Sequence, residues 1–446
     1  MLTIAPHRRL FLQSSLAGML GVSASGWFPK LAHAALHEAS AGSSKPRQCI
    51  LLWMSGGPSQ IDTFDLKPGH ANGGEFKEIQ TDVPGLSFSE HLPRLSKHGR
   101  DLAIIRSLST KEGDHERGTQ LMKTGYPPMG MIDYPSMGAA LASQLASDSV
   151  ALPPYVSVSP VDFLGRNASG PGYLGPKYSP LMVSGMPGSG GDNPTFAQLK
   201  VDAIKPPERV TSDQLERRLS MWKMLQHDFA TSHQGASVGA HQVVYENTLR
   251  LIHSKEADAF DLSKETDETR KKYGYGLFGQ GCLLARRLVE RGVRFVEVSL
   301  SSTNGGAFGW DTHADNFNAI KDLSRDLDNG WASLMDDLKE RGLLESTTIL
   351  WMGEFGRTPK INAQAGRDHF PRAWSCVFAG GGIKTGQVYG KTSEDGMDVV
   401  EQKTGVLDVL ATLCQSVGVT PETKLMSSLG RPTPIVESSP IAELLR

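Results

Sequence analysis

Asp311, His313 and Asp315 place two carboxylates and an imidazole within five residues. Oxygen and imidazole ligands together suit a borderline divalent metal such as zinc or manganese. The alternative is helix capping, in which Asp311 or Asp315 accepts amide protons at the start of the following helix. Capping accounts for one aspartate but not for two acids with a histidine between them. The spacing therefore favours metal ligation.

Glu354 follows the apolar run Thr347–Met352 and stands between Gly353 and Gly356. Such a run predicts a buried strand, and ligands of open α/β sheets bind at the carboxyl ends of the strands. A buried carboxylate needs a partner. Glu354 is therefore either a metal ligand or one half of an ion pair with Arg357 or Arg367.

Asp368 and His369 lie shortly after Glu354. Either both are metal ligands, or the acid orients the imidazole from behind. Three arginines near predicted strand ends could hold the oxygens of an anionic ester through forked hydrogen bonds; they are Arg106, Arg357 and Arg367.

The elements that would position these residues alternate along the chain. Continuous apolar runs predict strands covered on both faces, as in a parallel sheet; they are Cys49–Met54, Leu102–Ile105, Tyr155–Val158, Val293–Val298, Thr347–Met352 and Ser375–Ala379. Apolar residues at helical spacing predict helices over Ser212–Phe229, Val238–Phe260, Phe278–Arg291, Phe317–Arg341 and Val406–Val417. The Gly, Pro and Ser content of Gly165–Pro194 indicates a long irregular loop. Strands interleaved with helices predict a three-layer α/β/α fold with a mixed, mostly parallel sheet.

Composition narrows the class of protein. The 446 residues are 39% hydrophobic and 21% charged, which is typical of a globular chain. A formal net charge of -2 gives no reason to expect nucleic acid or an anionic membrane as partner. The four cysteines are far apart and form no C-x-x-C pair, so a thiolate zinc site is not expected and buried free thiols are favoured.

The first 34 residues resemble a targeting segment. Arg8 and Arg9 precede Leu10-Phe11-Leu12 and a mildly apolar stretch, and Ala32-His33-Ala34 offers a small-x-small cleavage site. The arginine pair indicates twin-arginine (Tat) export, with a Sec signal or a retained anchor as the alternative. We expect residues 35–47 to be a linker and residues 48–446 to be a single domain with no membrane span. The mature protein is then periplasmic or extracellular.

Several motifs together resemble the secreted bacterial domain-of-unknown-function 1501 family, which is placed near the alkaline phosphatase and sulfatase superfamily. They are Gly56–Asp65, Gly113–Glu116, Trp310–Phe317, Gly353–Pro359 and Gly366–His369. The resemblance runs from about Cys49 to the C-terminus. It implies an alkaline phosphatase-like domain, with an acid after the first strand, here Asp62 or Asp65, and a nucleophile after the second.

The resemblance also carries mismatches. Counting back ten positions from Gly125 places His115 at the nucleophile position, where sulfatases have cysteine or serine. A histidine can attack phosphorus but cannot become formylglycine. Phe355 stands where phosphatases have a histidine, and Ser55 and Gly56 stand where an aspartate is expected.

The function that these residues predict is metal-dependent hydrolysis of a phosphate or sulfate ester, on a small anionic ester or a sulfated or phosphorylated polysaccharide. One or two divalent ions (zinc, manganese or calcium) would be held by Asp62, Asp311, His313, Glu354, Asp368 and His369. His115 would be the nucleophile or the general acid/base, and the three arginines would stabilise charge. The alternative is a non-catalytic exported binding or assembly protein with an incomplete metal site.

Overall fold

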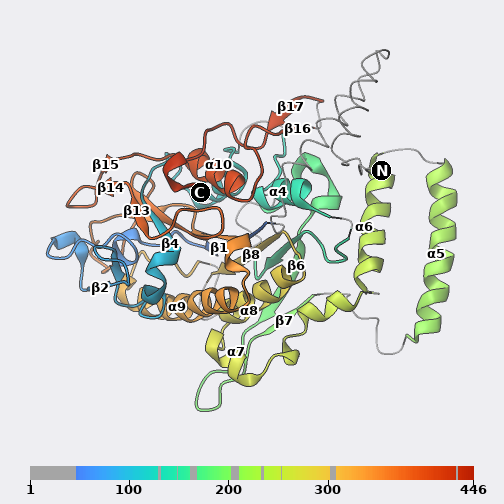
Figure 1. Ribbon diagram of the computed structural model, residues 1–446, viewed down its shortest axis with the longest axis horizontal. Helices are drawn as coiled ribbons and strands as arrows, with labels where there is room; N and C mark the ends of the chain where they lie inside the picture. The colour runs from blue at the N-terminus through green and yellow to red at the C-terminus, as the bar shows by residue number, and fades with distance from the viewer. Residues whose placement is uncertain are drawn as a thin grey trace, which may run out of the picture. The chain divides into compact units, whose positions relative to one another are not determined.

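A nine-stranded sheet forms the centre of the described chain (Figure 1). In spatial order its strands are β13 (Gln387–Tyr389), β4 (Leu102–Leu108), β12 (Trp374–Gly380), β9 (Thr347–Met352), β1 (Gln48–Met54), β8 (Phe295–Leu300), β5 (Tyr155–Val158), β6 (Leu181–Met186) and β7 (Gln198–Lys200). Only β12 and β7 run antiparallel to their neighbours. The expectation of a mixed, mostly parallel sheet is confirmed.

The structure is a computed structural model that describes most of the chain after Pro46. The described residues are 47–128, 132–147, 149–160, 168–201, 210–232, 236–252, 254–301, 308–427 and 430–446. Residues from 46 onward form one compact unit. The predicted export signal and nearly all of the predicted linker lie outside the described residues.

Helices cover both faces of the sheet and form the outer layers. Along β1, Ile50 and Leu52 belong to one buried cluster and Leu51 and Trp53 to another, because successive strand side chains point to opposite faces. The first cluster includes α8 (Leu277–Glu290) and α9 (Asn316–Glu340); the second includes α3 (His115–Thr124), α4 (Met137–Leu145) and α10 (Val406–Ser416). The three-layer α/β/α architecture is therefore confirmed, and burial on both faces explains why the strands read as continuous apolar runs.

The smaller elements complete the unit. The remaining α-helices in the described part of the chain are α5 (Ser212–Ser232), α6 (Ala236–Ile252) and α7 (Asp267–Tyr273). Four two-stranded sheets pair β2 (Glu78–Gln80) with β3 (Ser87–Ser89), β10 (Gly356–Arg357) with β11 (His369–Phe370), β14 (Lys391–Thr392) with β15 (Val399–Glu401), and β16 (Lys424–Met426) with β17 (Pro432–Pro434).

Two expected elements are corrected. The helix predicted over Val238–Phe260 is α6, which ends at Ile252, followed by a separate 3-10 helix over Lys255–Phe260. Ser254 lies between the two helices. Its side chain accepts a hydrogen bond from the Glu256 amide and caps the start of the 3-10 helix. The predicted loop Gly165–Pro194 contains β6, which pairs in parallel with β5; the glycines and prolines around this strand conceal its short apolar pattern.

Two further expectations concern thiols and membranes. All four cysteines are buried and unpaired, in agreement with the sequence. Among the described residues, no helix has the length and apolar character needed to cross a bilayer.

Candidate metal centre at the carboxyl edge of the sheet

Four segments meet where the parallel strands β1, β4, β8 and β9 end. His115 follows β4 and is the first residue of α3. The helix begins there because the Asp114 side chain accepts from the Arg117 amide, and it ends at Gly125, which adopts the left-handed conformation. This is the sheet edge at which ligands of open α/β folds bind.

The other segments bring their side chains to the same place. Asp311 and His313 lie in the loop that joins β8 to α9. Glu354 comes two residues after β9, and His369 lies in β11. Gly56, two residues after the end of β1, has a φ of +113°, and a Cβ there would be 2.5 Å from the Asp311 amide nitrogen. A side chain at position 56 would therefore displace the loop that carries Asp311.

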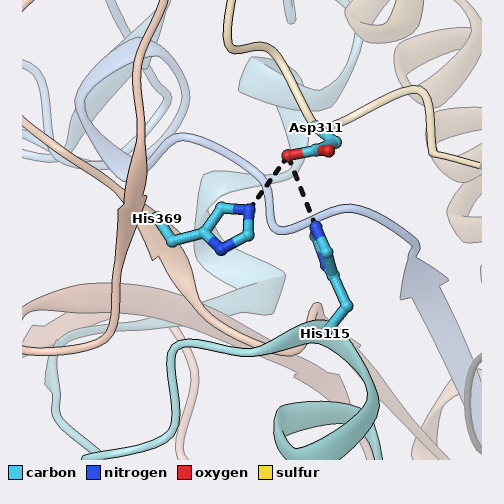
Figure 2. A group of neighbouring side chains, drawn as sticks. All are labelled: His115, Asp311 and His369. Carbon is cyan, nitrogen blue, oxygen red and sulfur yellow. Dashed lines mark hydrogen bonds and ion pairs between the residues drawn. The ribbon is translucent and has the colours of Figure 1, made fainter.

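The Oδ1 atom of Asp311 is the centre of the cluster (Figure 2). Three imidazole nitrogens surround it: Nε2 of His115 at 3.4 Å, Nε2 of His369 at 3.2 Å and Nε2 of His313 at 3.1 Å. The ligand atoms of His115, Asp311 and His369 all lie within 4.8 Å of one another, which is close enough for one ion to bind all three. The buried guanidinium of Arg357 also donates to Asp311.

In each of the three histidines the other ring nitrogen, Nδ1, makes a hydrogen bond that fixes the orientation of the ring. His115 Nδ1 is 2.7 Å from Glu354 Oε1, His313 Nδ1 is 2.8 Å from Asp368 Oδ1, and His369 Nδ1 is 2.8 Å from the Gly113 carbonyl oxygen. Carboxylates and carbonyls only accept, so each Nδ1 carries a proton and donates it. The Nε2 atoms then face the Asp311 carboxylate, and either a proton on Nε2 or a bound cation makes these contacts favourable.

Exposure divides the cluster into two parts. The side chains of His115, Asp311 and His369 are 17%, 25% and 27% exposed. His313 and Asp368 are 46% and 54% exposed. The first three therefore form a recessed set, and the His313–Asp368 pair lies at its solvent side.

The charges within the cluster shift its pKa values. Burial alone would lower the pKa of His115, but Asp311 and Glu354 outweigh burial and raise it to about 9. Burial alone would raise the pKa of Asp311, but His115, His369 and Arg357 hold it well below its usual range. The contact with His313 lowers the pKa of Asp368. All these shifts stabilise a positive charge next to Asp311.

The residues fit a divalent ion. Two buried polar atoms of the cluster, His115 Nε2 and Glu354 Oε2, have no hydrogen-bond partner among the described residues. Buried polar atoms without partners are costly unless something else binds them. Two imidazoles with a carboxylate suit zinc, whereas calcium prefers oxygen ligands throughout.

The expected ligand Asp62 lies elsewhere. Its fully buried carboxylate is bonded to Arg367, at 2.7 Å from Nε and 3.0 Å from Nη2, and to Ser59 and Asn316. Asp62 therefore neutralises a buried guanidinium and does not join the histidines. The alternative acid, Asp65, pairs with Lys67 and Thr392.

All three arginines make contacts within the described structure. Arg106 donates to the carbonyls of Phe64 and Ser87, at 2.7 and 2.8 Å. Arg357 donates to Asp311 and to backbone carbonyls, and Arg367 is bonded to Asp62 and to the carbonyls of Thr358, Pro359 and Asn72. These contacts indicate that all three have structural roles.

The remaining alternatives from the sequence are also decided by contacts. Asp315 occupies the N-cap position of α9 but makes no capping hydrogen bond, and Asp311 faces the histidines. Glu354 accepts from His115 and from the Gly56 amide, and it forms no ion pair with either nearby arginine in the described structure. Asp368 does orient an imidazole, but that imidazole belongs to His313 and not to its neighbour His369.

Sequence reasoning missed two features of the cluster. The carbonyl of Gly113 holds His369, and no side chain reveals a backbone acceptor. The sequence predicts His115 as nucleophile or general acid/base, and the structure adds that both of its ring nitrogens face carboxylates. The loop Gly113–Glu116 was recognised as a motif, but its contact with Glu354 spans 239 residues of sequence.

The model of a protein family, described as "Protein of unknown function (DUF1501)", matches residues 46–445. The chain belongs to this family. The match covers nearly all of the DUF1501 chain, including every residue of the cluster, and confirms the family that the motifs indicated. None of the curated proteins compared with the DUF1501 chain matches it.

Solved structures that resemble the DUF1501 chain do so at low identity. A sulfatase from Pseudoalteromonas sp. is 12% identical with a TM-score of 0.41, and the match covers 89% of this chain and 72% of that one. An alkaline phosphatase superfamily protein from Vibrio parahaemolyticus is 10% identical with a TM-score of 0.38, over 84% and 67%. A putative sulfatase from Bacteroides thetaiotaomicron is 9% identical with a TM-score of 0.40, over 84% and 72%.

Proposed function

We propose that this DUF1501 protein is a metal-dependent hydrolase of phosphate or sulfate esters. His115, Asp311 and His369 hold a divalent ion, for which zinc is the best fit. At the solvent-exposed side of the cluster, His313 donates a proton to the leaving group and Asp368 orients the His313 ring. The substrate is a small anionic ester or an ester group on a polysaccharide, and the protein acts outside the cytoplasm after twin-arginine export.

One observation carries the proposal: three imidazoles present Nε2 to a single carboxylate oxygen while Nδ1 is fixed from behind. A ligating histidine usually donates its second ring N–H to a carboxylate or carbonyl, which sets the tautomer and the ring orientation. Glu354 and Gly113 do this for His115 and His369. A set of surface histidines would have no reason to share this arrangement.

The residues divide the chemistry between them. A bound divalent ion would supply Lewis acidity at the ester oxygens and at water. Hydrolysis forms a bond from the water oxygen to phosphorus or sulfur, releases a proton from that water to solvent and breaks the bond to the leaving oxygen, which takes up one proton. His313 is placed at the open side to give that proton from Nε2, and Asp368 orients the ring through Nδ1. Arg357 keeps the Asp311 carboxylate ionised.

The test is a zinc titration of the full-length chain together with turnover of aryl phosphate and aryl sulfate. We expect about one equivalent of zinc in the wild type and hydrolysis of at least one ester, and we expect His369→Ala to lose both. His98→Ala is the matched control. His98 also lies between two carboxylates, 3.6 Å from Asp101 and 3.2 Å from Asp336, but it belongs to no group of possible metal ligands among the described residues.

Two outcomes would contradict the proposal. A wild type that neither binds zinc nor hydrolyses either ester would favour the non-catalytic binding or assembly protein. A His369→Ala variant with wild-type zinc content would mean that the ion, if bound, lies elsewhere.

Glu354→Gln should weaken zinc binding by roughly 10- to 100-fold, which is the usual cost of removing a group that orients a ligating histidine. The amide keeps the shape of Glu354 but cannot hold the Nδ1 proton of His115 as strongly as a carboxylate can. Competition with a zinc chelator measures the affinity. Unchanged affinity would show that His115 is not a ligand.

A further inference from the structure

A cavity lies at the amino ends of the parallel strands, whereas the metal centre lies at their carboxyl ends. Its volume is about 350 Å³, within the range of small-molecule pockets. Pro154 precedes β5, Leu181 begins β6 and Arg294 precedes β8, so the cavity is at the amino ends of these parallel strands. About two turns of α6, from Val244 to Leu251, complete the wall.

Arg294 has an unusual position in this cavity. Its side chain is 92% buried (8% exposed), and its Nε atom has no hydrogen-bond partner. Among the described residues no carboxylate forms an ion pair with it, and burial lowers its pKa without any opposing charge. Other buried arginines of the chain are paired: Arg357 with Asp311, and Arg367 with Asp62. A buried charge without a partner is expensive, so a missing partner is expected.

The lining indicates what that partner is. The described residues around the cavity include three cations, Lys177, Arg250 and Arg294, and no acidic side chain. The rest of the wall is largely apolar and includes Val150, Leu152 and Leu251. The cavity therefore offers one deep cation for a single anionic group and an apolar surface for a short hydrocarbon chain.

We propose that this cavity binds an amphipathic molecule with one anionic head, a carboxylate or a sulfate ester, and a short apolar chain. The head accepts hydrogen bonds from Arg294, and the chain packs against the apolar wall. The proposal is independent of the metal centre, which lies at the other edge of the sheet.

Calorimetry on the full-length chain tests this with three probes of equal chain length: octanoate, octyl sulfate and the neutral octyl glucoside. We expect at least one anionic probe to bind with one-to-one stoichiometry and at least tenfold more tightly than octyl glucoside. Arg294→Met should weaken that binding roughly 10- to 100-fold, because a hydrogen-bonded charge is lost. Arg217→Met, the control at an exposed arginine outside the cavity, should change it less than threefold.

Thermal unfolding gives a second readout. Without a probe, Arg294→Met should melt at or above the wild-type temperature, because it removes an unpaired buried charge. With the anionic probe present, the wild type should melt at a higher temperature than Arg294→Met, because the probe stabilises only the protein that binds it. Thr248→Trp, at an exposed residue of the cavity wall, should fill the cavity and leave Arg294 unchanged. This variant replaces Arg294→Met as the test if Arg294→Met does not fold.

Three results would overturn the proposal. The first is equal binding of octanoate, octyl sulfate and octyl glucoside, which would show an apolar cavity without anion recognition. The second is no binding of any probe to the wild type. The third is wild-type affinity for the anionic probe in the Arg294→Met and Thr248→Trp variants.

Discussion

Replacing His313 by alanine should lower kcat for an aryl ester by about 10²- to 10⁴-fold, the usual contribution of a general acid. The zinc content should stay close to that of the wild type, because the recessed set His115, Asp311 and His369 remains. His313 is 46% exposed and bonded to Asp368, so it can exchange protons with solvent and substrate. No other residue of the cluster combines that exposure with an imidazole.

The measurement is kcat and KM for a pair of aryl esters that differ in the acidity of the leaving group. A good leaving group needs no proton, so the defect should be smallest there. Added imidazole should restore part of the activity of His313→Ala. Loss of zinc from this variant would instead make His313 a fourth ligand and would leave the proton donor unidentified.

Asp368→Asn provides the matched comparison. It should lower kcat less than His313→Ala does, because Asp368 acts only by positioning and charging His313 through Nδ1. Its effect on kcat should be larger for the ester with the poorer leaving group, as in His313→Ala, since Asp368 acts through the same proton donor. An equal drop in kcat for both esters would indicate a merely structural role for Asp368.

The sheet was predictable because its strands are buried on both faces. Thr347–Met352 and Tyr155–Val158 coincide with β9 and β5 residue for residue. No continuous apolar run marks α3, because its sequence HERGTQLMKT is mostly polar, so periodicity does not predict this helix. The resemblance does locate it, since it aligns His115 with the start of the sulfatase nucleophile helix and Gly125 with the turn at its end, and the N-cap Asp114 is a second signal.

The members of the site were easier to predict than their roles. Chain order brought His115, Asp311, Glu354 and His369 to one sheet edge, since parallel strands end together. Whether a residue ligates or orients depends on which ring nitrogen or oxygen faces which neighbour. That is decided by contacts such as the 2.7 Å approach of Glu354 to His115, across 239 residues of sequence. Periodicity and spacing carry no information about such contacts.

Asp62 is another residue whose role the sequence does not show. Its substitution has the largest expected effect on stability. Asp62→Asn should lower the free energy of unfolding by about 3–5 kcal/mol, because it leaves Arg367 as a buried charge without the carboxylate that it pairs with in the described structure. Both side chains are fully buried, so solvent cannot screen the loss. Urea unfolding with linear extrapolation gives the free energy. The zinc content of the folded protein should not change, which distinguishes a structural Asp62 from a ligand.

A double-mutant cycle separates the ion pair from the cost of truncation. Asp62→Leu with Arg367→Met should be more stable than either single variant, because replacing both partners removes the unpaired charge that each single change leaves behind. Glu75→Gln is the control: Glu75 pairs with Lys321 at 2.7 Å, but the two are 57% and 43% exposed, and such pairs contribute at most about 1 kcal/mol. Additive effects of the two core changes would mean that the 2.7 Å contact between Asp62 and Arg367 does not couple them energetically, and the loss in Asp62→Asn would then come from its bonds to Ser59 and Asn316.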